Sequence, residues 1–569
     1  MNGMIIGTSW IFGTWILIVL PFLGIGLMIQ NQFKLKKQNI ELSLSAFWVG
    51  WSFVIVVLQL WHFLAPVEFT IHLIIISVGL ISMLLNIKNI GSLLRKQKQP
   101  LVKVLLMVPF GLFALWMANQ AMAGIMGYDT GLYHLSAIRW ATSYAIVPGL
   151  GNLHRQLAFN SSYFLFAALL DVGPWSKMSQ HLTNGVILFV ISLQIWVSVS
   201  KIIINRGRVE AYHVLNATFM VPIIYKYLWL LSSIDTDLPI FILGIVVSVE
   251  VCKLLFSPIT AQEALFSTFL IIFVSTIGIA IKLSFLVMGG LCSVIALWKL
   301  ATYRDQLQDN SKKLICLLLP TLLVLLPWVG RGIILSGYPI YPVHYLSVNV
   351  EWKLPERGVM NEARWIKSWA QKPRTHPDEV LADWSWLTPW MYSIYPRHFW
   401  DVIFPLLCLL FIGLPLMAYR GYRKEIEISY GFLFLLPGIA GIIFWFFTAP
   451  DPRFAGAVFW YLGAGAVAIG FARYSKMSFL ILFFSLGLIT FKAIDLEKPL
   501  DLGLIHEIHP ISQIETTPFT TKSGLILNKP ATGNQCWDAP LPCTPYPNAK
   551  LRLREDGNLG SGFIRLSEN

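Results

Sequence analysis

The stretch "VLLMVPFGLFALWMANQAMA" at Val104–Ala123, followed by "GYDTGLYHLSAIRW" at Gly127–Trp140, decides the fold. The first part is an apolar run of about 20 residues, the length that crosses the hydrocarbon core of a membrane as a helix. The second part places an Asp, a His and an Arg directly after that run. Together they indicate a membrane-spanning helix that ends in a polar segment at the membrane surface.

The composition of the whole chain points the same way. Of its 569 residues, 56% are hydrophobic and 13% are charged, whereas a soluble protein carries about 25% charged residues. We therefore expect an all-α polytopic membrane protein with about 14 transmembrane helices, of which His213–Leu231 is the weakest. The expected spans are Ile11–Ile29, Leu44–Phe63, Ile71–Leu85, Val104–Ala123, Val186–Ile204, His213–Leu231, Ile240–Leu255, Leu265–Ile281, Phe285–Leu300, Leu314–Val329, Val402–Ala418, Phe432–Phe447, Val458–Phe471 and Phe479–Phe491.

The formal net charge of +13 comes from basic residues in short loops between these spans. The positive-inside rule places such loops in the cytoplasm, so the charge needs no nucleic acid partner. Both termini are then extracytoplasmic. The opening residues lack the basic start and small-residue cleavage site of a signal peptide, and we interpret them as the first span. The basic loops are Lys34–Lys37, Arg95–Lys103, Arg206–Arg208, Tyr303–Lys313 and Tyr419–Glu425.

This topology divides the chain into three parts. Residues 1–103 form three additional N-terminal spans, residues 104–493 form a transmembrane core, and residues 494–569 form a small extracytoplasmic segment of short strands and turns. The core carries two long outer loops, 124–180 and 332–400. The first is expected to hold amphipathic interfacial helices over Leu132–Trp140 and Phe159–Gly173.

The C-terminal segment contains Cys536 and Cys543 in "NQCWDAPLPCTP". A disulfide between them is favoured in an oxidising compartment, and two unpaired thiols are the alternative.

Asp129 is the first candidate catalytic residue. A carboxylate at the outer end of a span either is solvated and inert or acts as a general base on a hydroxyl acceptor. Asp129 lies five residues before His134, which we expect to assist or orient it. Tyr133 and Arg139 of the same segment are assigned to substrate binding.

A second pair of carboxylates, Asp235 and Asp237, stands in "LSSIDTDLPIF" just before a span. Paired carboxylates can hold a metal or divide acid and base roles. The alternative is a helix start, with Asp237 at the N-cap and a proline just inside. We assign Asp237 to the catalytic group and Asp235 to substrate binding. The cofactor stays unassigned, with a divalent metal as one option.

Three cations also stand at outer ends of spans: Lys282, Arg331 and Arg453. An arginine there can bind a phosphate with two hydrogen bonds, whereas the alternative is a side chain that reaches lipid headgroups. The loop 332–400 is rich in Trp and Tyr, which form membrane-interface belts and also stack on sugar rings. This combination suits a lipid phosphate that carries a sugar.

The order of a span, an outer Asp, two interfacial helices and a return span resembles the opening module of GT-C fold glycosyltransferases. "APDPRF" at Ala449–Phe454 is similar to the Pro-Arg-aromatic segment near the donor phosphate in several of those enzymes. "GYDTGLYHLSAIRW", "VPGLGNLH", "FNSS" and "CWDAPLPCTP" resemble a group of bacterial polytopic membrane proteins, often encoded near surface-polysaccharide genes. The resemblance implies a GT-C-like core, a catalytic Asp129 and a polyprenyl-phosphate-linked sugar as donor.

We therefore expect a glycosyltransferase in the cytoplasmic (inner) membrane. It would move a sugar from a polyprenyl-phosphate donor to a surface glycan or glycolipid acceptor on the extracytoplasmic side. One alternative is a polysaccharide polymerase or ligase that transfers a lipid-linked oligosaccharide. Another is a non-enzymatic transporter of lipid-linked sugar. Transporters often have internal repeats and midplane charges, whereas this sequence shows no repeat and its charged residues stand mostly at span ends.

Overall fold

The computed structural model of the protein describes residues 2–35, 40–87, 100–125, 127–204, 209–307, 310–471, 487 and 503–566. Most of these residues are helical. The helices are α1 (Asn2–Gln30), α2 (Ile40–Trp61), α3 (Phe69–Leu85), α5 (Pro100–Gln120), α6 (Leu135–Ser143), α7 (Leu150–Leu153), α8 (Tyr163–Leu170), α9 (Thr183–Ile204), α10 (Ala211–Thr218), α11 (Met220–Pro222), α12 (Asp237–Phe256), α13 (Ala261–Ile281), α14 (Leu286–Ala301), α15 (Asn310–Ser336), α16 (Glu356–Gln371), α17 (Pro377–Val380), α18 (Leu387–Ile394), α19 (Phe404–Cys408), α20 (Leu414–Tyr422), α21 (Ile428–Thr448) and α22 (Val458–Phe471). The strands are β1 (Thr516–Thr520), β2 (Ile526–Pro530), β3 (Leu551–Leu553) and β4 (Phe563–Arg565).

Nine helices in the described ranges are long and apolar enough to cross a membrane. Three shorter apolar helices, Phe69–Leu85, Leu105–Gln120 and Val458–Phe471, accompany them. This agrees with the expected class, a mostly helical multi-pass membrane protein. The nine are Gly3–Phe33, Ile40–Trp61, Ser179–Ile204, Asp237–Phe256, Ala261–Ile281, Leu283–Ala301, Leu317–Ser336, Phe399–Tyr422 and Ile428–Thr448.

Two of the 14 expected spans have no continuous helix in the described residues. His213–Leu231 is broken into α10, α11, a π-helical turn at Ile223–Tyr227 and a 3-10 turn. Pro222 ends α11 and offers no backbone N–H, so it interrupts the helical hydrogen bonds there. Phe479–Phe491 lies outside the described residues, apart from residue 487, as do Arg206–Arg208 and parts of the other basic loops.

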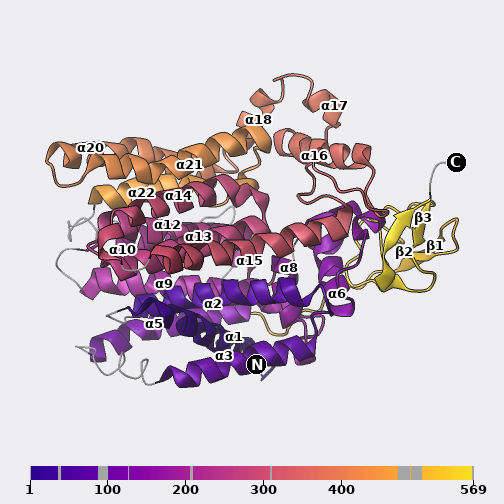
Figure 1. Ribbon diagram of the computed structural model, residues 1–569, viewed down its shortest axis with the longest axis horizontal. Coiled ribbons are helices and arrows are strands. Elements are labelled where there is room, and N and C mark those ends of the chain that lie inside the picture. Colours follow the sequence, from indigo (N-terminus) through magenta and orange to yellow (C-terminus); the bar gives the residue numbers. More distant parts are fainter. Residues whose placement is uncertain are drawn as a thin grey trace.

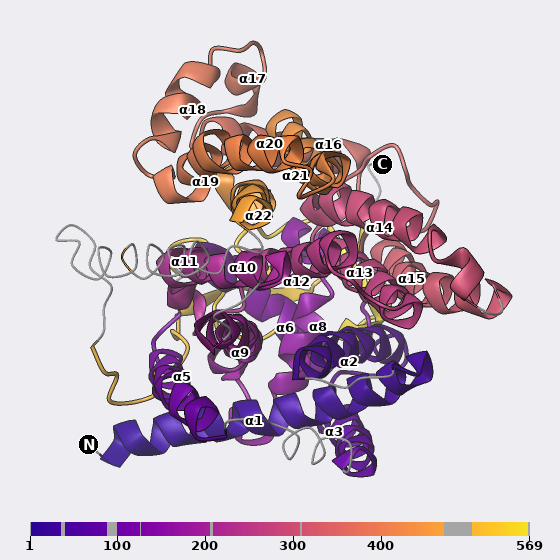
Figure 2. The same cartoon turned by 90° about the vertical axis from the view of Figure 1, so that its left-hand side faces the viewer.

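The helices form one bundle that has distinct ends (Figure 1). The helices α6 and α16–α18 and the strands gather at one end, which we call the cavity end. The end of α20, with the basic residues that follow it, lies at the opposite end. Seen along the bundle, α1, α3 and α5 lie on one side, α19–α22 lie on the other, and α9, α12 and α13 run between them (Figure 2). Residues of α1 and α2 share one hydrophobic core with α12 and α13.

The first outer loop differs from the expected interfacial helices. Thr130–His134 form a π-helical turn, and α6 follows at Leu135–Ser143. All eight residues of α8 are buried, so this helix packs inside the protein rather than along a membrane surface. The reason is its sequence, "YFLFAALL", which is apolar on every face.

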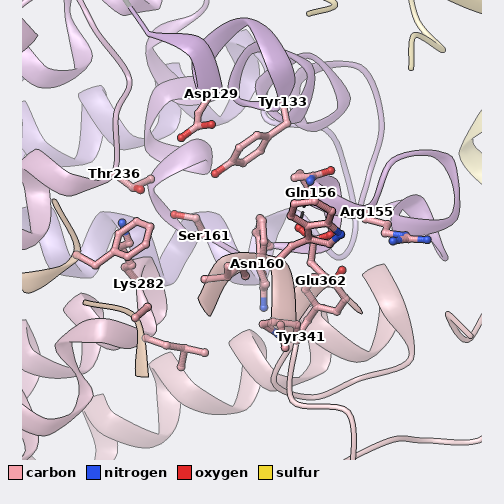
Figure 3. A pocket seen from close by; sticks show the side chains of 18 of the residues that line it. Asp129, Tyr133, Arg155, Gln156, Asn160, Ser161, Thr236, Lys282, Tyr341 and Glu362 are labelled. Carbon is pink, nitrogen blue, oxygen red and sulfur yellow. Dashed lines mark hydrogen bonds between the residues drawn. The ribbon is translucent and has the colours of Figure 1, made fainter. Parts of the chain in front are cut away.

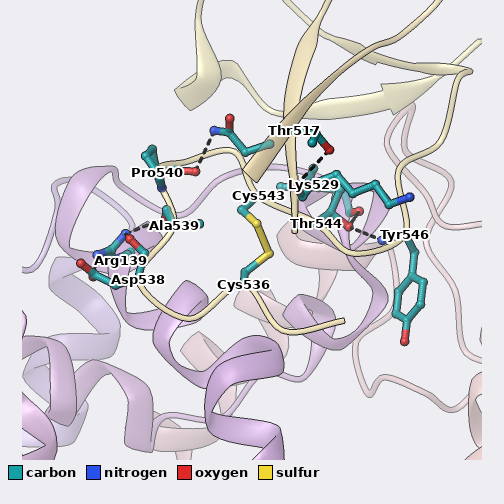
Figure 4. Close-up of a disulfide and its surroundings, with 12 residues drawn as sticks. Arg139, Thr517, Lys529, Cys536, Asp538, Ala539, Pro540, Cys543, Thr544 and Tyr546 are labelled. Atoms are coloured by element: carbon teal, nitrogen blue, oxygen red, sulfur yellow. Dashed lines mark hydrogen bonds and ion pairs between the residues drawn. A yellow bond between two sulfur atoms is a disulfide. The ribbon is translucent and has the colours of Figure 1, made fainter. Parts of the chain in front are cut away.

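The C-terminal segment folds against α6 and the π-helical turn. It contains two antiparallel hairpins, with β1 paired to β2 and β3 paired to β4. A disulfide joins Cys536 to Cys543. Arg139 of α6 forms an ion pair with Asp538 and donates hydrogen bonds to the carbonyl oxygens of Asp538 and Ala539 (Figure 4). The segment therefore closes over the cavity end of the bundle.

Candidate active site

A large cavity opens at the cavity end and occupies about 1760 Å³. Its wall combines the start of α12, the ends of α13 and α21, the π-helical turn, α16 and the C-terminal segment. Pockets for drug-sized ligands occupy about 300–1,000 Å³. The volume therefore suits a ligand larger than one sugar ring.

Four charged side chains form a continuous row in this wall. Arg453 Nη1 donates to Asp129 Oδ2 at 3.2 Å, and Arg453 Nε lies 3.5 Å from Asp237 Oδ2. Lys282 forms an ion pair with the other oxygen of Asp237. The phenyl ring of Phe454 lies below both cations, 4.5 Å from Lys282 Nζ. The side chains of Asp129 and Arg453 are 31% and 44% exposed, so both can reach a ligand.

Local sequence explains how this row is assembled. Asp451 lies just after α21, and its carboxylate accepts the backbone N–H of Arg453 at 2.9 Å, which fixes the turn Pro452–Ala455. Lys282 follows the last residue of α13 in extended backbone, where α13 ends and a 3-10 turn begins. Each cation thus stands where an apolar helix stops, beside the start of α12.

The carboxylate that caps α12 belongs to Asp235 and not to Asp237, the residue expected at the N-cap. The helix α12 begins at Asp237, and the Asp235 carboxylate accepts the Asp237 N–H at 2.6 Å. Asp235 therefore caps the helix, and this leaves the Asp237 carboxylate for Lys282 and Arg453. Burial, with the nearby charge of Asp237, raises the pKa of Asp235 to about 7.

His134 is buried beneath the row. Its Nδ1 lies 3.4 Å from the Thr130 hydroxyl, and its ring contacts those of Tyr133 and Phe164. The ring thus pairs with Thr130 rather than with the Asp129 carboxylate. Burial lowers the pKa of His134 to about 4, so the imidazole is neutral at pH 7. Tyr133 lines the cavity beside Asp129 (Figure 3), and burial raises the pKa of its phenol.

Two of the expected binding residues lie away from this row. Arg139 holds the C-terminal segment through Asp538. Arg331 is buried in α15, where it donates to His62 Nδ1 at 2.5 Å and to Asn160 Oδ1 at 3.1 Å. Asn160 itself lines the cavity, so the hydrogen bond from Arg331 holds a residue of the cavity wall in place.

Sequence reasoning missed a second polar end of the cavity, formed by His154, Arg155, Tyr341, Glu362 and Arg565. These residues come from segments far apart in the sequence. None stands next to a long apolar span in the way that Asp129 or Lys282 does, apart from Tyr341, which shortly follows α15. The signals in the sequence were the amphipathic pattern of α16 for Glu362 and the dense aromatics for Tyr341.

No group of three or more His, Cys, Asp or Glu side chains is arranged to hold a metal ion among the residues that the structure describes. The carboxylates of Asp129 and Asp237 are paired with Arg453 and Lys282, and the carboxylate of Asp235 accepts the first N–H of α12.

The fold and this site define a multi-pass helical membrane protein with a large charged cavity at one end of its bundle. A family model described as a domain of unknown function (DUF8201) matches residues 9–460, and the chain belongs to that family. The match includes the three N-terminal spans and ends before the C-terminal segment. No curated protein and no solved structure matches this chain.

Proposed function

We propose that the protein is a membrane glycosyltransferase that moves a sugar from a polyprenyl-phosphate donor to a glycan or glycolipid acceptor. The observation that supports this proposal is the row Asp129–Arg453–Asp237–Lys282 in the wall of a large cavity. It joins a ligand-accessible carboxylate to two cations at the ends of apolar helices. A lipid phosphate, its sugar and a hydroxyl acceptor need these groups together.

In the proposed reaction, Arg453 and Lys282 bind the donor phosphate. Guanidinium and ammonium groups form charge-assisted hydrogen bonds with phosphate oxygens, and these strengthen as the phosphate leaves with its extra charge. The acceptor hydroxyl oxygen attacks the anomeric carbon, and the bond from that carbon to the phosphate oxygen breaks. Asp129 takes the hydroxyl proton as general base.

Neighbouring side chains have supporting roles in this scheme. Arg453 contacts both Asp129 and Asp237, so it sets the distance between the base and the phosphate site. The neutral His134 packs against Tyr133 and orients that ring without adding charge. Asp237 holds Lys282 in place.

The finer topology belongs to the same proposal. The core beyond the first three spans is GT-C-like, with about 14 spans in all, and the cavity end together with the C-terminal segment faces the extracytoplasmic side of the inner membrane. Two features support this orientation. The basic end of α20 lies opposite the cavity end (Figure 1), and the disulfide suits an oxidising compartment.

A polysaccharide polymerase or ligase remains the second candidate because the volume of the cavity favours it. About 1760 Å³ accommodates several sugar rings as well as a single one. A product that grows by repeat units rather than by one sugar would identify this second reaction.

The test is a transfer assay in membranes with radiolabelled polyprenyl-phosphate sugars. Asp129→Asn removes the base, and we expect transfer to fall by about 100-fold or more at unchanged expression. Asp556→Asn is the matched control, because Asp556 is exposed on the turn between β3 and β4, away from the cavity lining. Wild-type transfer by Asp129→Asn would contradict the assignment of the base.

A further inference from the structure

The second polar end of the cavity has no role in the reaction just described. Arg155 and Gln156 come from a 3-10 turn at Arg155–Ala158, and Glu362 comes from α16. Figure 3 shows Arg155, Gln156, Tyr341 and Glu362 together on the side of the pocket away from Lys282 and Thr236. Arg565, the last residue of β4, also lines the cavity.

Several buried polar atoms at this end lack a hydrogen-bond partner within the described part of the chain. They are the hydroxyl of Tyr341, Nε of Arg565 and a ring nitrogen of His154, whose other ring nitrogen lies near the Gln156 side chain. His154 is 3% exposed and Tyr341 is 6% exposed, so bulk water does not replace the missing partners freely. Buried polar groups without partners are costly and rare. Several such groups around one cavity indicate that a bound ligand supplies the missing hydrogen bonds.

The charge at this end is positive. Burial and the neighbouring charge of Arg155 lower the pKa of Arg565, so the two guanidinium groups are close enough to repel each other. Glu362 offsets only part of this charge, and its Oε1 already accepts a hydrogen bond from Gln156 at 3.1 Å. Two neighbouring arginines, one of which has an unpaired Nε in the described residues, form the type of environment that binds an oxyanion.

A row of aromatic rings connects this end to the row of charged side chains. The ring of Tyr133, beside Asp129, lies 5.9 Å from that of Phe159. The ring of Phe159 lies 5.5 Å from that of Tyr341. All three residues line the cavity. A saccharide stacked along these rings would reach both polar ends at once.

We infer that Arg155 and Arg565, with His154 and Tyr341, bind an anionic group, a carboxylate or a phosphate, on the acceptor saccharide. The anion fixes one end of the acceptor, and the aromatic row directs a hydroxyl of the acceptor toward Asp129. That the bound saccharide is the acceptor rests on the proposed function. The anion site rests only on the side chains at this end.

The experiment measures equilibrium binding of three probes to the full-length protein in lipid nanodiscs: glucuronate, glucose 6-phosphate and glucose. The first carries a carboxylate, the second a phosphate, and the third no charge. We expect at least one anionic probe to bind about tenfold more tightly than glucose, because charged hydrogen bonds are the stronger ones. The anion that binds more tightly identifies the acidic group of the acceptor. Equal binding of all three, or binding of none, overturns the inference.

Variants locate the site. Arg565→Gln is expected to lower the affinity for the anionic probe about tenfold, and Arg552→Gln is expected to leave it unchanged. Arg552 is the matched control because it is exposed on β3, in the same hairpin. Tyr341→Phe removes a hydroxyl that has no partner in the described residues, so it tests the site without disturbing packing. Equal effects of Arg565→Gln and Arg552→Gln would overturn the site.

The same binding assay separates this inference from the proposed function. Asp129→Asn should keep full affinity for the anionic probe, because Asp129 belongs to the other end of the cavity (Figure 3). If Asp129→Asn also keeps wild-type transfer, the proposed base is wrong while the anion site stands. If transfer depends on Asp129 but Arg155→Gln and Arg565→Gln leave anion binding unchanged, the anion site is wrong while the proposed function stands.

Discussion

At the scale of single residues, the site depends on which side chains already have partners. Arg453 bridges Asp129 and Asp237, whereas Arg139 and Arg331 are held by Asp538 and Asn160. All three arginines are candidates by sequence, but only Arg453 joins the row of charges. The position of an arginine in the sequence predicts which part of the fold it lies in. The direction of its side chain then decides whether it lines the site or holds another part of the protein in place.

Asp235 provides a prediction about pH. Its pKa in the folded protein is about 7, above the ordinary value of 3.8. Between these two pH values the folded state binds one more proton than the unfolded state, so the free energy of unfolding falls as pH rises through this window. Asp235→Asn keeps an oxygen that can accept the Asp237 N–H but cannot titrate. We therefore expect the thermal midpoint of the wild type to fall relative to Asp235→Asn from about pH 4 to about pH 7.

The measurement is thermal unfolding of both proteins in nanodiscs across this pH range. Asp378→Asn, a change at an exposed carboxylate of α17, serves as the control and should follow the wild type. Parallel curves for the wild type and Asp235→Asn would show that Asp235 keeps an ordinary pKa.

At the scale of elements, the π-helical turn and the disulfide loop form one unit. The backbone N–H of Trp537 donates to the Gly131 carbonyl at 3.0 Å, and Gln535 donates to the Tyr128 carbonyl. The indole of Trp537 packs directly on Gly131. Two motifs that are about 400 residues apart in the sequence, "GYDTGLYHLSAIRW" and "CWDAPLPCTP", are therefore in contact. The C-terminal segment supports the turn that carries Asp129.

Gly131→Ala tests this coupling. A Cβ at residue 131 would lie 2.5 Å from the Trp537 ring, which is closer than any real contact. We expect the substitution to destabilise the contact by about 1–3 kcal/mol, the usual cost of overpacking, and to loosen the C-terminal segment. Limited proteolysis should then release that segment faster than in the wild type. Gly111→Ala is the control, because Gly111 lies in the helix α5 and has open space where a Cβ would stand. Equal cleavage rates for Gly131→Ala and Gly111→Ala would contradict the coupling.

At the scale of the whole molecule, helix ends at one side of the bundle produce the site. Asp237, Lys282 and Arg453 stand at or near the start of α12, the end of α13 and the end of α21. Spans of similar length in one bundle end at the same two faces. The sequence could therefore predict that these polar residues share a face, once the spans were located.

The remaining parts of the site required the fold. His154, Arg155 and Arg565 meet because α7 packs beside β4, with Asn152 donating to the Phe563 carbonyl at 3.2 Å. No periodic pattern in the sequence predicts a contact between a short helix in a loop and a strand more than 400 residues later. The buried position of α8 and the broken segment His213–Leu231 were missed for a similar reason, since apolar composition alone does not separate a span from a buried helix.

Orientation in the membrane is a prediction at this scale. The proposed topology places the turn between β3 and β4 outside the cell membrane and the end of α20 inside. Asp556→Cys should therefore react with a membrane-impermeant maleimide in spheroplasts, and Tyr422→Cys should react only after the membrane is permeabilised. Both positions are exposed in the folded protein, so access to the reagent decides the result. The reverse pattern would invert the topology and move the proposed reaction to the cytoplasmic side.

The most direct test of the central claim is the binding of a polyprenyl phosphate, because it needs no knowledge of the sugar. The affinities of polyprenyl phosphate and of the uncharged polyprenol are measured for the wild type, Arg453→Gln and the control Arg423→Gln, whose residue lies beyond α20 at the opposite end of the bundle. We predict that the wild type and Arg423→Gln prefer the phosphate by about tenfold or more, and that Arg453→Gln loses most of this preference. An equal preference in all three proteins, or none in the wild type, would contradict a donor-phosphate site at Arg453 and Lys282.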